Sequence, residues 1–169
     1  LKEFAVFETS NEVPQAFGRV NNQNLHALPQ QDMLIVTRSA FLQQAEELAQ
    51  FHRDEEQLRV QVVELNQIYN EFSSGTNDVT AIRDFVKMFY DRAGADVNQM
   101  PRYLLLFGDG TYDNKSLGDY FIPTYESDKT YESLETYLSD DYFGLLDDNE
   151  GANVTNTAAE IADVGIGRI

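Results

Sequence analysis

Five short apolar runs along the chain predict strands, and stretches of helical periodicity separate the first three of them. The first run is continuous, which is typical of a strand that is buried on both faces of a parallel sheet. Each run has the length of an ordinary strand and borders polar or turn-forming residues. The five runs are "DMLIVT" (32–37), "RVQVVEL" (59–65), "RYLLLFGDG" (102–110), "YFGLLDD" (142–148) and "DVGIGRI" (163–169).

The segment 39–58 predicts the first helix. Its apolar positions recur at steps of three and four residues, so that they share one face. Thr37 or Ser39 is available as the N-cap. The residues of this face are Phe41, Leu42, Ala45, Leu48, Ala49 and His52.

The segment 77–94 predicts a second helix with clearer ends. Asn77 or Asp78 can cap its start, and Gly94 can end it. An apolar stripe runs between these ends and consists of Val79, Ile82, Phe85, Val86 and Phe89.

Alternation of strands and helices predicts right-handed crossovers and a parallel sheet. We therefore expect an α/β fold, an open and mainly parallel sheet with helices on both faces, over residues 32–169. Residues 1–31 contain a short strand-like stretch, Phe4 to Phe7, followed by polar, turn-rich sequence. This part is expected to be the tail of a preceding β-rich region and a linker.

Charge and composition argue against nucleic-acid binding and exclude disulfides and thiol chemistry within this chain. The 169 residues include 29 acids and 12 bases, for a net charge of −17, which disfavours binding to nucleic acid and favours cations or basic partners. Residues 101–169 hold 14 of the acids and 4 of the bases, so this part is the more acidic. The chain contains no cysteine, so it supplies neither a disulfide nor a catalytic thiol.

The loop "FGDGTYD" (107–113) is the first candidate for chemistry, because ligands gather at the carboxyl ends of parallel strands. A dehalogenase-type phosphatase would need a nucleophilic aspartate at position 107, which is Phe107. The loop also lacks the glycine spacing and the lysine of a phosphate-binding P-loop. Three interpretations of the loop stay open: a functional loop, a cation site and a structural turn. A small enzyme that uses Asp109 or Asp113 as a base is a further hypothesis.

A calcium site is the main metal hypothesis. An EF-hand beginning at Asp147 fails, because its glycine and glutamate positions hold Ala152 and Ala158. A looser site could still form after folding from acidic side chains, and its alternative is a solvated acidic surface. Its candidate ligands are Asp109, Asp113, Asp140 and Asp141, with Asp147 and Asp148 as further acids.

The remaining candidates are weaker. His26 and His52 stand in no metal-binding or catalytic motif, and no GxSxG nucleophile elbow is present, so both histidines are expected to be structural. The tyrosine-rich acidic stretch 124–144 could face a partner or pack over the protein's own sheet edge.

A set of segments in order along the chain closely resembles the gingipain-like cysteine peptidases, and in particular the cell-surface sortases of the type IX secretion system. The run of Asp-Asp-Tyr-Phe-Gly-Leu-Leu after a strand and a Gly-Asp-Gly loop is the most specific part. The segments are "NQNLHAL" (22–28), "DMLIVT", "YLLLFGDGTYD" (103–113), "IPTYES" (122–127), "SDDYFGLLDD" (139–148) and "VGIGRI" (164–169).

The resemblance implies that this chain is the non-catalytic first α/β subdomain of such a peptidase. The catalytic histidine and cysteine are expected after Ile169, on a second, caspase-like subdomain, and no catalytic residue is expected here. The chain begins at Leu1 without a methionine or signal peptide and ends inside an apolar pattern, so we expect a fragment of a longer protein.

The same resemblance implies the activity of the intact protein and its location in the cell. The intact protein would remove C-terminal secretion signals from cargo at the bacterial cell surface, associated with the outer membrane and with other type IX secretion components. No cofactor would be required, although calcium could bind. The alternative is a self-contained acidic module that binds calcium or a basic protein.

Overall fold

The computed structural model describes residues 19–113, 118–127, 137–148, 150–151 and 161–169. The strand expected at Phe4 to Phe7 lies outside these residues. Within them, no helix is long and apolar enough to cross a lipid bilayer.

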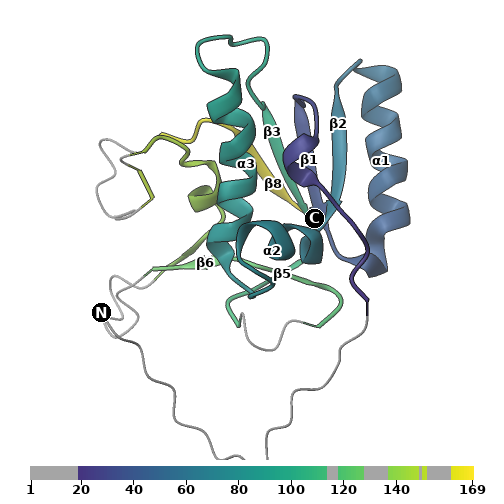
Figure 1. Ribbon diagram of the computed structural model, residues 1–169, viewed down its shortest axis with the longest axis vertical. Helices are drawn as coiled ribbons and strands as arrows, with labels where there is room; N and C mark the ends of the chain where they lie inside the picture. The colour runs from purple at the N-terminus through teal and green to yellow at the C-terminus, as the bar shows by residue number, and fades with distance from the viewer. Residues whose placement is uncertain (1–18, 114–117, 128–136, 149, 152–160) are drawn as a thin grey trace, which may run out of the picture.

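A parallel sheet of four strands forms the centre of the molecule (Figure 1). Its order is β2 (Val60–Glu64), β1 (Met33–Thr37), β3 (Tyr103–Phe107) and β8 (Gly165–Arg168). All five residues of β1 are buried, because this strand has neighbours on both sides and layers on both faces. The expected α/β fold with a mainly parallel sheet is confirmed.

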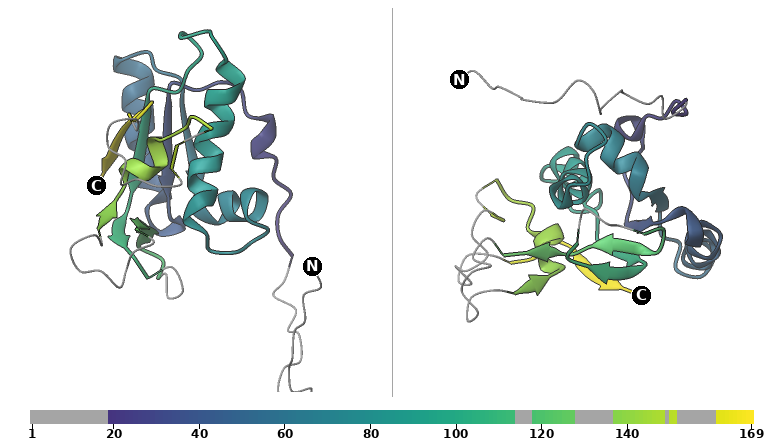
Figure 2. Two further views of the ribbon diagram at one scale, coloured as in Figure 1. Left: turned by 90° about the vertical axis from the view of Figure 1, so that its left-hand side faces the viewer. Right: turned by 90° about the horizontal axis from the view of Figure 1, so that it is seen from below.

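Helices cover both faces of the sheet, as predicted (Figures 1 and 2). Helix α1 (Leu42–Glu55) packs on one face, where it buries only Ala45 and Ala49 and so lies close to β1 and β2. Helices α2 (Leu65–Phe72) and α3 (Val79–Ala93) pack on the other face. Their larger apolar side chains make the second face the main core of the protein.

Helix α3 has the predicted ends. The carboxylate of Asp78 accepts a hydrogen bond from the Thr80 backbone N–H at 2.8 Å, and Gly94 ends the helix with a φ of 55°. The predicted cap of the first helix is wrong. A 3-10 turn, η2 (Ser39–Phe41), precedes α1, whose N-cap is Phe41 with no side-chain cap.

The run 142–148 does not form the strand that its apolar pattern predicted. Residues Asp141–Gly144 form a 3-10 helix, η3, and its buried Tyr142 and Phe143 pack against α3. A short apolar run fits a buried turn of helix as well as a strand, and packing against α3 decides between them here.

Two small sheets lie beyond the end of the main sheet where its strands finish (Figure 1). Strand β4 (Asp109–Thr111) pairs in parallel with β5 (Phe121–Pro123), and β6 (Tyr125–Glu126) pairs antiparallel with β7 (Leu138–Ser139). They bring the acidic C-terminal part of the chain to the carboxyl edge of the main sheet.

Candidate functional site

Strand order reverses between β1 and β3, so the carboxyl ends of these two strands mark the switch point of the sheet. The hydroxyl of Thr37, the last residue of β1, donates to the Phe107 carbonyl at 3.0 Å. The Gly-Asp-Gly loop begins at the next residue, Gly108. This is the place in an open α/β sheet where a ligand is expected.

The loop is built into the small sheet by its main chain. The Gly108 N–H donates to the Ile169 carbonyl at 2.8 Å, and the Asp109 N–H donates to the Tyr120 carbonyl at 3.1 Å. A Cβ atom at Gly108 would lie 3.0 Å from the Tyr120 oxygen and 3.2 Å from Ile122 Cγ1. Gly108 is therefore required by the close approach of β5.

Asp109 and Asp113 are both exposed in this loop. An Asp109 carboxylate oxygen accepts the neighbouring Gly110 N–H at 2.8 Å, and the Asp113 N–H donates to the Thr111 hydroxyl at 3.1 Å. These are local turn interactions. They give no specific support to a role for either aspartate as a catalytic base.

Asp140 forms a structural ion pair with Arg168, the last residue of β8. Its two carboxylate oxygens accept from the Arg168 Nη2 at 2.6 Å and Nε at 2.8 Å. The same guanidinium donates to the carbonyls of Ile122 at 3.1 Å and Gly108 at 3.3 Å. Arg168 thereby ties the main sheet to β5 and to the loop after β3.

The four candidate calcium ligands do not form one cluster. Asp141, next to Asp140, is exposed, and its N–H donates to the Ser139 hydroxyl at 3.0 Å. Over the described ranges, no three acidic or histidine side chains come together to hold a metal ion. Calcium binding stays a prediction, which titration calorimetry on the protein and on its Asp109→Asn and Asp141→Asn variants would check.

Cationic side chains of α3 hold the chain on both sides of Asp147, the residue at which an EF-hand would begin. Arg83 donates to the Leu145 carbonyl at 2.6 Å, and Lys87 donates to the Leu146 carbonyl at 2.7 Å. Lys87 also pairs with Asp148 at 2.9 Å. Burial alone would lower the pKa of Lys87, but its hydrogen bonds to Asp148 and Asp91 raise it. The protein's own cations therefore occupy oxygens of this segment.

The tyrosine-rich stretch packs on the protein's own fold where the structure describes it. The rings of Tyr125 and Tyr142 stack with centroids 4.2 Å apart. The Tyr142 hydroxyl lies 3.2 Å from the Thr80 hydroxyl on α3. This agrees with the packing alternative, while Tyr131 lies outside the described residues.

Arg38 is the site residue that the sequence analysis missed. It follows β1 directly and is only 7 % exposed. Its guanidinium donates to Asn66 at 3.3 Å and lies 3.9 Å from Asp119, a side chain that is 80 % exposed. A basic residue directly after a buried strand was the available signal. Chemically, Arg38 gives the switch point a cation that suits an anionic group.

Neither histidine is placed for catalysis with a thiol. His26 Nδ1 lies 2.8 Å from the Glu71 carboxylate, and its ring stacks on Phe72. His52 on α1 lies 2.9 Å from Glu56. Because the chain contains no cysteine, these residues cannot complete a Cys-His dyad within it.

Comparison with known proteins places this geometry in a family. The model of peptidase family C25 matches residues 26–169. Among solved structures, that of dimeric latent PorU from Porphyromonas gingivalis is similar, with a TM-score of 0.76 and 39% identity over 90% of this chain. The chain spans 15% of that PorU chain. A search of curated proteins gave no match. The chain belongs to peptidase family C25, the gingipain family of cysteine peptidases.

Proposed function

We propose that this chain is the non-catalytic first subdomain of a gingipain-like sortase that removes C-terminal secretion signals from cargo of the type IX secretion system. The observation that carries the proposal is the likeness to PorU, at 39% identity over 90% of the chain. The role of the intact protein rests on that family resemblance, since the chain spans 15% of PorU.

The features at the carboxyl edge of the main sheet favour a structural, non-catalytic role for this chain. Its loop is held by main-chain hydrogen bonds, and Asp140 is engaged by Arg168. A cysteine peptidase needs a thiolate nucleophile, and this chain has none. The histidine and cysteine would lie on a second, caspase-like subdomain that contacts this one. Cargo proteins and other secretion components would be the remaining partners, at the bacterial cell surface and the outer membrane.

Two experiments test the proposal. The purified 169-residue chain should not cleave a peptide that carries a cargo signal junction, because it lacks the nucleophile; cleavage by the chain would contradict the assignment. Deletion of the gene in the source bacterium should leave cargo with its C-terminal signal, as measured by mass spectrometry of intact cargo. Normal removal of the signal in the deletion strain would contradict the sortase role.

A further inference from the structure

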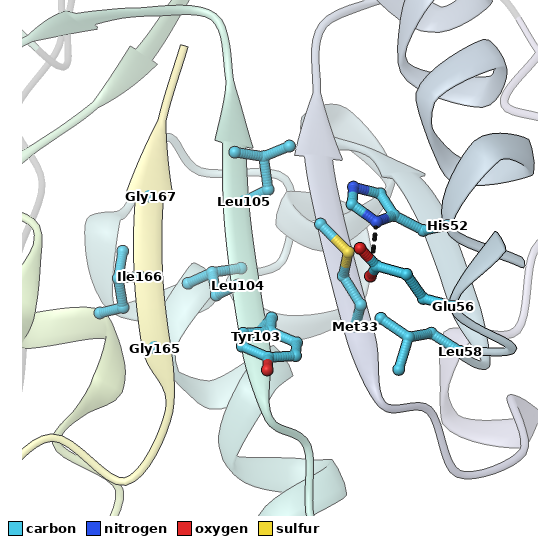
Figure 3. Close-up of a pocket in the computed structure, with 10 residues that line it drawn as sticks. All are labelled: Met33, His52, Glu56, Leu58, Tyr103, Leu104, Leu105, Gly165, Ile166 and Gly167. Carbon is cyan, nitrogen blue, oxygen red and sulfur yellow. Dashed lines mark hydrogen bonds and ion pairs between the residues drawn. The ribbon is translucent and has the colours of Figure 1, made fainter.

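The described part of the chain has cavities of two chemical kinds. A groove of about 460 Å³ beside α1 is lined mainly by apolar side chains, and its His52 and Glu56 pair with each other at 2.9 Å (Figure 3). A second cavity, of about 550 Å³, lies beside α2 and the turn before α3 and offers hydrogen-bonding groups to a ligand. The polar side chains in its lining are those of Arg19, Asn66, Tyr69, Asn70 and Asn77.

Arg38, which contacts this cavity through Asn66, is a buried cation whose hydrogen-bonding capacity is mostly unused. A guanidinium carries five N–H donors, and among the described residues only Nη1 donates, to Asn66 Oδ1 at 3.3 Å. The exposed Asp119 carboxylate lies 3.9 Å from Nη2, which is too long for a hydrogen bond. A buried charge is costly unless it is paired. Nε and Nη2 of Arg38 therefore lack an acceptor in the part of the chain that the structure describes.

Tyr69 adds a second buried donor to this region. It lies one turn after Asn66 on α2 and is 2 % exposed, and its hydroxyl makes no hydrogen bond with any described residue. Burial raises the pKa of Tyr69, and the charge of Arg38 opposes part of that rise. The hydroxyl therefore keeps its proton at neutral pH and lies within electrostatic range of the guanidinium. Leaving a buried hydroxyl unpaired is destabilising, so a missing acceptor is the natural explanation.

The surroundings favour an acceptor with a single negative charge. Glu64 and Asp78 stand close by as the N-caps of α2 and α3, where backbone N–H groups engage their carboxylates. Together with Asp119 they would repel a phosphate group, which carries nearly two charges at pH 7. A carboxylate carries one charge, and its two oxygens match the fork of a guanidinium.

An aromatic surface borders Arg38 on the side of Asp119. Tyr120 follows Asp119 and is 58 % exposed, and its ring centroid lies 5.6 Å from that of Phe41, three residues after Arg38. The contact of Arg38 with Asp119 and the contact of the two rings thus join the same two segments. A ligand whose carboxylate reaches Arg38 can place an apolar neighbour on the Tyr120 ring.

We propose that Arg38 and Tyr69 form a binding site for the carboxylate of a glutamate or aspartate side chain in a peptide, with an apolar neighbour of that residue on Tyr120. The carboxylate accepts from the unused N–H groups of Arg38 and from the Tyr69 hydroxyl, and it displaces Asp119. Asn66 holds the guanidinium in place. The inference goes beyond the proposed function and stands without it, because it concerns binding by this chain alone.

NMR titration of the purified 169-residue chain tests the ligand class. The probe is the peptide acetyl-Ala-Glu-Phe-Ala-amide, and its control carries glutamine in place of glutamate. The backbone amide signals of Arg38, Asn66 and Tyr69 should shift with the glutamate peptide, at a Kd about tenfold or more below that of the control. Equal affinities would overturn the proposal. Inorganic phosphate that binds at these residues more tightly than the glutamate peptide would also overturn it, because the site would then suit another class of anion.

Variants test the two sides of the site separately. Tyr69→Phe removes only the unpaired hydroxyl, so it should weaken binding of the glutamate peptide about five- to tenfold without lowering the midpoint of urea unfolding. Asp119→Asn removes the competing carboxylate and should tighten binding about two- to fivefold. The matched control Asp141→Asn removes the same charge from another exposed position and should bind like the unchanged protein.

Two results with the variants would overturn the inference. One is unchanged peptide affinity in both Tyr69→Phe and Asp119→Asn; because Asp119 is exposed, this test does not depend on how well Tyr69→Phe folds. The other is equal tightening by Asp119→Asn and Asp141→Asn, since the net charge of the chain and not a site at Arg38 would then govern binding.

Discussion

Glu71 on α2 is the residue that fastens the segment before β1 to the main core. Its carboxylate accepts the Leu25 N–H at 2.7 Å and the Gln23 side-chain amide at 2.8 Å, and it lies beside His26. Burial alone would raise the pKa of Glu71, but these donors outweigh it and lower the pKa from 4.5 to about 2. The charged form is therefore stabilised in the folded protein.

This lowered pKa predicts a dependence of stability on pH. A carboxyl group with a depressed folded pKa stabilises the protein above its unfolded pKa and loses that effect as the pH falls through the folded value. As the pH falls from 4.5 to about 2, protonation of Glu71 should therefore lower the free energy of unfolding by about 3 kcal/mol. Urea unfolding of Glu71→Gln should show a loss of about 1–3 kcal/mol at pH 7 and little difference from the unchanged protein near pH 2.

The exposed Glu55 on α1 provides the control for this variant. Glu55→Gln should change the free energy of unfolding by no more than about 0.5 kcal/mol at either pH. A Glu71→Gln variant as stable as Glu55→Gln at pH 7 would show that the carboxylate does not hold the segment before β1.

Asp140 and Asp141 are neighbours with different predicted effects. Asp140→Asn removes the charge that pairs with the mostly buried Arg168 and should lower the free energy of unfolding by about 1–3 kcal/mol. Asp141→Asn changes an exposed side chain and should be neutral within about 0.5 kcal/mol. Urea unfolding at pH 7 measures both, and equal effects would contradict the structural role of the Asp140–Arg168 pair.

At the scale of elements, the two helical faces contribute differently to stability. Phe85 on α3 is fully buried and packs edge-on against Phe72 and Phe89. Phe51 on α1 is 55 % exposed. Phe85→Ala should lower the free energy of unfolding by about 3–5 kcal/mol, whereas Phe51→Ala should change it by less than about 1 kcal/mol. Thermal unfolding of both variants checks this, and similar melting temperatures would contradict the assignment of the main core.

Strong periodic patterns allowed the strands β1, β2, β3 and β8 and the helices α1 and α3 to be predicted from the sequence. Helix α2 was missed because Leu65 extends the apolar run of β2. The signals of a helix were nevertheless present. Leu65, Ile68 and Tyr69 are buried on one face, and Glu64 with Gln67 forms a capping box at its start.

Tertiary pairings at the candidate site could not be predicted in the same way. Arg168 and Asp140 are 28 residues apart, and only the pairing of β8 with β3 brings them to one edge. The abundance of acidic side chains suggested that Asp140 could help to bind calcium after folding. The sequence does not show that Arg168 is the cation that reaches it. The loop after β3 was predictable as a candidate site, because ligands gather at the carboxyl ends of parallel strands, whereas the strand order that makes it a switch point came from the structure.

At the scale of the whole molecule, the features fit one part of a larger peptidase. One sheet face is fully packed, while the other keeps a groove beside α1. The carboxyl edge carries a buried Arg38 and a loop held by main-chain hydrogen bonds. The central claim is that catalysis by the intact protein depends on a thiol outside these 169 residues and not on the aspartates of this loop.

Cleavage of a signal-bearing peptide by the full-length protein tests that claim most directly. The protein is assayed before and after alkylation with iodoacetamide, and next to a variant that carries both Asp109→Asn and Asp113→Asn. We predict that alkylation abolishes cleavage and that the double variant keeps its kcat/KM within about twofold. Full activity after alkylation, with a loss of about a hundredfold or more in the double variant, would contradict the account.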